Sequence, residues 1–235
     1  MMAIKGILFD KDGTLIDANG TWVPFYRKLL SEEFGISTQE AEALMVKAGY
    51  DAVGERFLPG STLASGTTQQ LAEIWWPDVS PAQQKEIGER LDRQYAPMAR
   101  LFLKPLLDLT PLLQELRRQG LALGVGTNDS EISARGHIEA LGVNSLFDVI
   151  IGADSVPTAK PSGDMVRLFA GRTGLSCNEV AMVGDNSHDM EEAHNGGAGL
   201  AVAVLTGNSG REHMEHLADH VLDSVEALPR LLRSL

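Results

Sequence analysis

The sequence has a single cysteine, no long apolar run and a shortage of positive charge, and each of these absences excludes a class of protein. Cys177 cannot form an intrachain disulfide, which fits a reducing cytoplasm. No apolar run approaches the ~18 residues that cross a bilayer, and the segment before Asp10 is too short for a secretory signal. We therefore expect a soluble cytoplasmic protein, and its 235 residues allow a substantial buried core without disulfides.

The charge balance excludes two classes of partner. The chain has 32 acidic and 20 basic residues, a net charge of −12. It lacks the basic surface that duplex nucleic acid requires, and it repels anionic membranes. We expect neither nucleic acid nor membrane as a partner, but a small molecule attracted by local chemistry. The sequence is equally compatible with a monomer and a homodimer.

Short apolar runs predict strands buried on both faces, as in a parallel sheet. The runs are Ile4–Phe9, Leu121–Val125, Phe147–Ile151, Val180–Val183 and Leu200–Leu205. Helical patterns separate the last four runs, and they are Glu131–Leu141, Gly163–Arg172 and Ser187–His194. This alternation predicts an α/β fold with a doubly wound, Rossmann-like parallel sheet.

One long stretch breaks this alternation and predicts an inserted all-helical domain. It has no convincing strand, and its helical patterns are Pro24–Phe34, Thr38–Lys47, Thr68–Trp75 and Pro81–Tyr95. We expect an α/β core formed by residues 1–18 and 101–235 and a helical domain at residues 19–100. Most of the inserted aromatic residues should form the core of this domain, and they are Trp22, Tyr26, Phe34, Trp75, Trp76 and Tyr95.

Polar residues follow three of the predicted strands closely. Asp10, Thr127 and Asp185 each come within a few residues of the end of an apolar run. In open α/β sheets ligands bind beyond the carboxyl ends of the strands, so we expect a site where these residues meet.

The first of these segments carries two carboxylates, Asp10 and Asp12, separated by one residue. Two such groups repel each other, and a divalent cation relieves the repulsion; hard oxygen ligands favour Mg²⁺. Gly13 allows a sharp turn directly after the pair. An acidic capping turn explains this segment alone equally well, whereas an EF-hand loop is excluded because Thr21 replaces the required Glu.

The other segments supply anion-binding and metal-binding groups. Thr127 and Asn128 at a predicted helix start suit an anion, and Lys160 is held at a rigid corner by the following proline. Asp185 and Asp189 suit direct and outer-shell coordination of Mg²⁺. Each segment alone is more often capping or surface structure, and His188 is expected to face solvent. In this order at strand ends, however, the segments together indicate a phosphate and metal site.

These motifs resemble those of the haloacid dehalogenase-like hydrolase superfamily, in its phosphoglycolate-phosphatase-like branch with a helical cap. The segment Phe9–Leu15 matches the nucleophile motif, Thr127 the phosphate-binding residue, Lys160 the lysine motif, and Asp185 with Asp189 the acidic metal motif. Residues 19–100 stand where that family inserts its cap. Two departures are that Lys11 replaces a common aliphatic residue and that Ser162-Gly163 replaces the usual segment after Lys-Pro.

The resemblance implies a Mg²⁺-dependent phosphatase of a small organic phosphate, either phosphoglycolate-like or a sugar phosphate. It implies that Asp10 attacks phosphorus to form an aspartyl-phosphate. It further implies that Asp12 protonates the leaving alkoxide and then activates water. Mg²⁺ would be held by Asp10, the backbone carbonyl of Asp12 and Asp185.

The resemblance also assigns the remaining residues. Thr127, Asn128 and Lys160 would bind the phosphoryl oxygens, with Lys160 also offsetting negative charge on the nucleophile. Asp189 would lie in the second shell and orient Lys160 or a metal-bound water. In the inserted domain, Arg27 and Arg56 are candidate contacts for a second anionic group, although surface positions are favoured for both.

Several alternatives stay open at this stage. A phosphoryl mutase of the same fold uses the same core residues. A phospho-accepting signalling domain is about half this length and has no insertion after its first strand. Dehalogenases lack the second acid, and phosphonate cleavage needs a cap lysine, for which Lys28 and Lys47 are available. The complete residue set argues against a scaffold that lost its activity.

Overall fold

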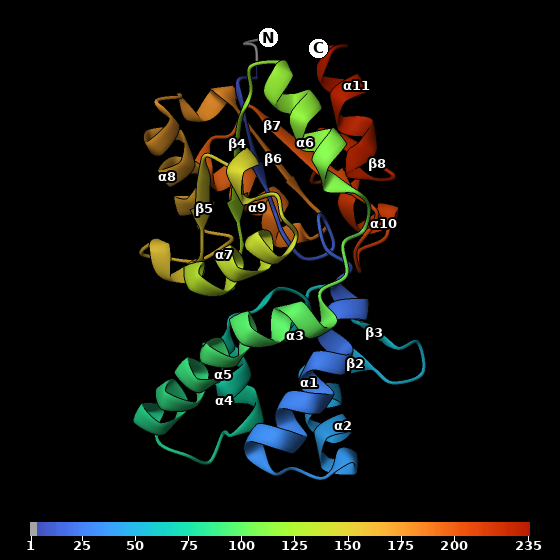
Figure 1. Cartoon of the computed structure of the whole chain (residues 1–235), viewed down its shortest axis with the longest axis vertical. Coiled ribbons are helices and arrows are strands. Elements are labelled where there is room, and N and C mark those ends of the chain that lie inside the picture. Colours follow the sequence, from blue (N-terminus) through green and yellow to red (C-terminus); the bar gives the residue numbers. More distant parts are fainter. Residues whose placement is uncertain (1–3) are drawn as a thin grey trace.

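The computed structural model describes residues 4–235, with all side chains in that range except those of residues 96–100. The chain forms a body built on a sheet and, beside it, a body of helices (Figure 1). The C-terminus lies at the end of the sheet body that faces away from the helical body. Within the described residues, no helix has the length and apolar character needed to cross a bilayer.

The sheet body confirms the predicted α/β fold. In the described part of the chain, the strands form a parallel sheet in the order β5-β4-β1-β6-β7-β8. Their bounds are β1 Gly6–Phe9, β4 Ala122–Gly126, β5 Val149–Ile151, β6 Val180–Gly184, β7 Leu200–Val204 and β8 His220–Leu222. The five predicted strands are confirmed, and the short, half-buried edge strand β8 is an addition.

Helices cover both faces of the sheet, and the alternation of side chains along β1 shows why. Ile7 and Phe9 pack with α6, α7 and α11, whereas Leu8 packs with α8 and α9 on the opposite face. The helices of this body are α6 Leu109–Arg118, α7 Glu131–Ala140, α8 Asp164–Thr173, α9 Ser187–Gly196, α10 Arg211–Met214 and α11 Leu228–Leu232. The three predicted helices are confirmed, and α8 and α9 end at Gly174 and Gly197 in the left-handed conformation.

The helical body follows β1 directly. Its elements are α1 Ala18–Phe34, α2 Thr38–Lys47, β2 Tyr50–Asp51, β3 Arg56–Phe57, α3 Thr62–Ser65, α4 Thr68–Trp75 and α5 Pro81–Phe102. The predicted bounds of α2 and α4 are confirmed, and each helix begins with a capping box, Ser37 with Glu40 and Thr67 with Gln70. The prediction found no strand here, and the structure adds the small antiparallel hairpin of β2 and β3.

Helix α1 begins earlier than its pattern predicts. The predicted pattern starts at Pro24, a residue type that is favoured in the first helical turn. In the structure the Asp17 side chain accepts a hydrogen bond from Gly20 N and caps the helix, so Pro24 lies inside it. The extra residues include the buried Trp22, whose ring packs edge to face against that of Phe25 at a centroid distance of 5.0 Å.

The helical body has its own hydrophobic core. The predicted aromatic residues all belong to this core or pack against it. Tyr26 and Tyr95 from α1 and α5 meet at its centre, and their hydroxyls are hydrogen-bonded at 2.9 Å.

The two chain segments that join the bodies are tied to each other. Asp17 N donates to Lys104 O at 2.8 Å, and the Lys104 and Asp17 side chains form an ion pair at 2.8 Å. Farther along α1, the Asn19 amide donates to Asn208 of the sheet body at 2.8 Å and accepts from Phe57 N at 2.9 Å. These bonds join the helical body to the sheet body in this arrangement.

Asp92 on α5 is a charged group whose burial opposes folding. Thr68 donates to its Oδ2 at 3.1 Å, but Oδ1 is buried without a hydrogen bond. Burial, reinforced by Asp129, raises the pKa of Asp92 to about 6. Because the folded pKa lies above the unfolded one, folding is favoured at low pH, and this advantage is lost as the pH rises from about 4 through 6.

We therefore predict that Asp92→Asn raises the free energy of unfolding by about 1 kcal/mol at pH values above 6. This value is smaller than the full pKa shift implies, because water reaches part of Asp92 and screens its charge. The gain should shrink when the pH is lowered to about 4. Urea denaturation at the two pH values measures it, with the exposed Asp78→Asn as control. An equal effect of Asp92→Asn at both pH values would contradict this account.

Candidate active site

The residues predicted for the site come together at the carboxyl end of the sheet. Asp10 follows β1, Thr127 follows β4 and Asp185 follows β6, and these strands are neighbours at the centre of the sheet. The loop after β5 contributes Lys160, and the first turn of α9 contributes Asp189. These five residues are at most 8% exposed and line one pocket.

Lys160 bridges two carboxylates at the bottom of this pocket. Its Nζ lies 2.5 Å from Asp10 Oδ1 and 2.7 Å from Asp189 Oδ1. Burial alone would lower the pKa of Lys160, but the two carboxylates outweigh it and raise that pKa, so the ammonium stays charged. Burial also raises the pKa of Asp10, to about 7, even though Lys160 opposes the shift. The ionised form of Asp10 therefore needs more positive charge than Lys160 supplies.

The carboxylates of Asp10, Asp185 and Asp189 can supply that charge by holding a metal ion. Each offers an oxygen atom, and these atoms lie within 4.8 Å of one another. Burial and then repulsion from Asp10 and Asp189 raise the pKa of Asp185 well above its usual range. A buried group of carboxylate oxygens with excess negative charge suits a hard divalent cation, so the residues fit the predicted metal.

Two glycines leave room for Asp185. Gly13 has a φ of +82°, and a Cβ there would lie 2.5 Å from Asp185 Cγ. A Cβ at Gly207 would lie 1.7 Å from Asp185 Oδ2. The turn expected at Gly13 is therefore confirmed, and its lack of a side chain also clears the space for the carboxylate.

Asp12 is held by one residue from each body. Its carboxylate accepts hydrogen bonds from Lys11 Nζ and from Trp22 Nε1 on α1. Lys11 is fully buried, pairs also with Asp129 at 2.9 Å, and lies 4.9 Å from the centre of the Trp22 ring. Burial opposes its charge, but Asp12 and Asp129 outweigh burial and raise the pKa of Lys11. The residue that departs from the family pattern is thus a buried cation beside the second acid.

Asn128 uses its side-chain amide to position neighbouring backbone. Its Oδ1 accepts from Lys160 N at 3.0 Å, and its Nδ2 donates to Ser65 O at 2.7 Å. It therefore connects the lysine loop to α3 of the helical body. Beside it, Thr127 Oγ1 accepts from Asp129 N at 3.2 Å and lines the pocket.

The helical body closes the pocket from above. Its contribution includes the apolar side chains Ala18, Leu63 and Ala64. It also includes Trp22, Tyr26 and Tyr95, three of the aromatic residues predicted mostly for the core of the inserted domain. The pocket between the two bodies has a volume of about 40 Å³.

Some expectations for individual residues were wrong. His188, expected to face solvent, lines the pocket, and its Nδ1 lies 3.1 Å from Asn186 Oδ1. Sequence reasoning also missed Asp129, whose carboxylate lines the pocket and pairs with Lys11. Its position directly after Thr127 and Asn128 was the available signal, but capping explained that position equally well.

The candidate cations of the helical body lie outside the pocket. Arg27 pairs with Glu42 at 2.5 Å and donates to the Tyr50 hydroxyl, and Arg56 is exposed. Lys28 pairs with Glu32 on the surface, and Lys47 is exposed. Surface positions, favoured for Arg27 and Arg56, are confirmed, and neither lysine is placed for phosphonate chemistry.

Replacing Lys11 tests its buried ion pairs. We predict that Lys11→Leu lowers the free energy of unfolding by about 3 kcal/mol, because it leaves Asp129 and Asp12 without their cation. Adding Asp129→Asn should recover part of this loss. Chemical denaturation measures the free energy of unfolding of both variants. Lys28→Leu is the control, because it removes an exposed ion pair with Glu32 that contributes less than about 1 kcal/mol. A loss for Lys11→Leu no larger than the control's would refute the prediction.

Comparison with known proteins identifies the family. The model of the haloacid dehalogenase-like hydrolase family matches residues 4–197, well over half of the chain. A phosphoglycolate phosphatase of Pectobacterium atrosepticum is 29% identical over 227 residues, covering 95% of this chain and 90% of the relative. One of Shigella sonnei is 31% identical over 196 residues, covering 81% and 77%.

The fold comparison agrees. The crystal structure of a predicted phosphatase from Clostridium acetobutylicum superposes with a TM-score of 0.74 at 18% identity, and the match covers 100% of both chains. The strand-end carboxylates, the buried lysine and these matches lead to one conclusion: the chain belongs to the haloacid dehalogenase-like hydrolase family, in the branch that includes phosphoglycolate phosphatases.

Proposed function

We propose that this phosphatase is Mg²⁺-dependent and moves the phosphoryl group of a small organic phosphate first to Asp10 and then to water. The observation that carries the proposal is Asp10 itself, a carboxylate buried at a strand end and bonded to the charged Lys160 in the pocket between the two bodies. Phosphoglycolate-like and sugar phosphates are both within this proposal.

In this mechanism Asp10 is the nucleophile. A carboxylate attacks phosphorus in line and expels the alcohol, which splits a difficult hydrolysis into two easier steps. Lys160 holds Asp10 and stays positively charged, so it offsets the negative charge of the incoming phosphate. Asp189, which accepts the other hydrogen bond of Lys160, positions the lysine.

Asp12 is the general acid and then the general base. It protonates the leaving alkoxide in the first step and takes a proton from the water that hydrolyses the aspartyl-phosphate in the second. Its contacts with Lys11 and Trp22 restrict how its carboxylate can turn. Because Trp22 belongs to the helical body, this restriction requires that body to be in place over the sheet.

The phosphoryl oxygens are bound by Thr127, by Lys160 and by groups that Asn128 holds in position. Asp10, the backbone carbonyl of Asp12 and Asp185 would hold Mg²⁺, which when bound supplies charge that stabilises the phosphoryl oxygens. The excess of buried carboxylates over cations at this point supports the assignment.

We further propose that residues 19–100 are a cap that opens for substrate and closes over residues 1–18 and 101–235. The aromatic roof over the pocket and the hydrogen bond from Asn128 to Ser65 support a closed arrangement. Closure of this kind excludes water during phosphoryl transfer. Action in the cytoplasm stays a prediction from the sequence.

Release of phosphate from p-nitrophenyl phosphate tests the proposed function. We predict that Asp10→Asn lowers kcat on the order of 10³-fold or more, and that removing Mg²⁺ with a chelator abolishes turnover until Mg²⁺ is restored. The exposed Asp223→Asn is a matched control and should retain full activity.

Undiminished turnover by Asp10→Asn would overturn the nucleophile assignment, and turnover without any divalent metal would overturn the metal dependence. A phosphoryl mutase uses the same residues. It would pass the group to a second substrate hydroxyl in place of water, so steady release of inorganic phosphate separates the two activities.

A further inference from the structure

We propose that the pocket takes the phosphate ester of a small uncharged alcohol in preference to phosphoglycolate, whose leaving group carries a carboxylate. The inference rests on the proposed function and names the substrate class of the same site.

The sheet side of the pocket is strongly acidic. It is lined by five carboxylates, those of Asp10, Asp12, Asp129, Asp185 and Asp189. Among the described lining residues the only lysine or arginine is Lys160, and it is already bonded to Asp10 and Asp189. Lys11, behind the pocket, is likewise bonded to Asp12 and Asp129. A bound Mg²⁺ and the phosphate largely balance each other, so a substrate carboxylate would find no unpaired lysine or arginine among the described lining residues.

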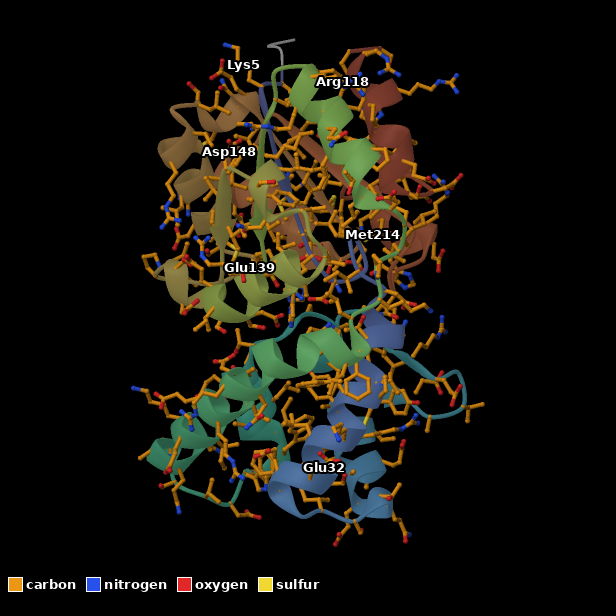
Figure 2. The ribbon with its side chains drawn as sticks, viewed as in Figure 1. Lys5, Glu32, Arg118, Glu139, Asp148 and Met214 are labelled. Atoms are coloured by element: carbon orange, nitrogen blue, oxygen red, sulfur yellow. The ribbon has the colours of Figure 1, made fainter. Side chains whose placement is uncertain are left out.

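The cap side offers no compensating charge from the side chains that the structure describes. Arg27 pairs with Glu42, and Arg90 pairs with Glu33 on the outer surface. Lys28 pairs with Glu32, which lies on the part of α1 distant from the sheet body (Figure 2). The remaining described cations of the cap are exposed, namely Lys47, Arg56, Lys85 and Arg93.

What the cap does present is aromatic surface and neutral hydroxyls. Trp22, Leu63 and Ala64 give apolar contact, and the Tyr26 and Tyr95 hydroxyls bond to each other at 2.9 Å. Burial raises the pKa of both tyrosines, so each keeps its proton. One of the two hydroxyl protons forms the hydrogen bond between the tyrosines. The other hydroxyl proton can be donated to a ligand, and the lone pairs of the hydroxyl oxygens can accept from one. Such a pair suits a neutral hydroxyl and does not neutralise a carboxylate.

The burial of the pocket also disfavours a second negative charge. The residues that line it are buried or half-buried. A carboxylate placed among them would lose water without gaining an ionic partner, which is the costly case for a buried charge.

A matched pair of esters tests the inference. Phosphoglycolate and 2-hydroxyethyl phosphate share the two-carbon backbone and the primary phosphate ester, and they differ in whether the far end is a carboxylate or a hydroxymethyl group. We expect kcat/KM of the Mg²⁺-loaded wild type to be at least tenfold higher for 2-hydroxyethyl phosphate. Asp10→Asn, measured in parallel on both esters, shows that the turnover is that of the proposed site.

Adding a cation to the pocket should reverse the preference. Ala64→Lys places an ammonium among the lining residues and should shift the kcat/KM ratio toward phosphoglycolate by at least tenfold. Ser65→Lys serves the same purpose if Ala64→Lys does not fold. Arg56→Met, which removes an exposed cation of the cap, should leave the ratio unchanged.

The outcomes separate this inference from the proposed function. Equal or faster Asp10-dependent turnover of phosphoglycolate by the wild type overturns the inference and leaves the phosphatase standing. An unchanged ratio in a folded lysine variant overturns the explanation by charge. Failure of both esters to turn over in an Asp10-dependent manner overturns the proposed function, and the inference with it.

Discussion

The arrangement of the site depends on one buried ammonium group, that of Lys160. Its bonds to Asp10 and Asp189 connect the end of β1, the loop after β5 and the first turn of α9. Without this cation, buried carboxylates would face each other with nothing to offset their repulsion. Its charge is still not enough, since burial raises the pKa of Asp10 to about 7 and that of Asp185 well above its usual range. The remaining imbalance is the physical reason to expect a divalent cation.

A second buried lysine connects the chemistry to the cap. Lys11 and Trp22 together hold the carboxylate of Asp12, so one of its partners comes from each body. In the same way Asn128 connects the lysine loop to Ser65 of the cap. Under the proposed closure, the helical body would therefore do more than exclude water: it would complete the set of contacts around the second acid.

The sequence predicted the sheet and the site better than it predicted the cap. Apolar runs that end in Asp10, Thr127 and Asp185 mark central strands, because parallel strands buried on both faces read as continuous apolar segments. Helix α1 was predicted to start at Pro24, but it starts six residues earlier, at Ala18. The local pattern around Pro24 cannot show that the Asp17 side chain caps the helix. The hairpin of β2 and β3 has only two residues in each strand, too few to show the alternation of apolar and polar residues that marks a strand.

The charges around the pocket were the least predictable part. Lys11 follows Asp10 directly and would normally be read as solvated, yet it is fully buried because Asp12 and Asp129 converge on it from different segments. His188 was expected to face solvent, yet it lines the pocket where residues of both bodies meet. Such placements depend on long-range contacts that no local pattern records. The division of the chain into core and cap at residues 19 and 100 stays a prediction.

The central claim is that the phosphoryl group passes through a covalent bond to Asp10, and trapping that bond tests it most directly. The wild type would be mixed with a phosphate ester radiolabelled on phosphorus and quenched in acid within a single turnover. The protein would then be digested, and the peptide that carries the label would be identified. The account predicts acid-stable label on the peptide that contains Asp10, and no label in Asp10→Asn. Label on another side chain, or phosphate release with no labelled protein at any quench time, would contradict it.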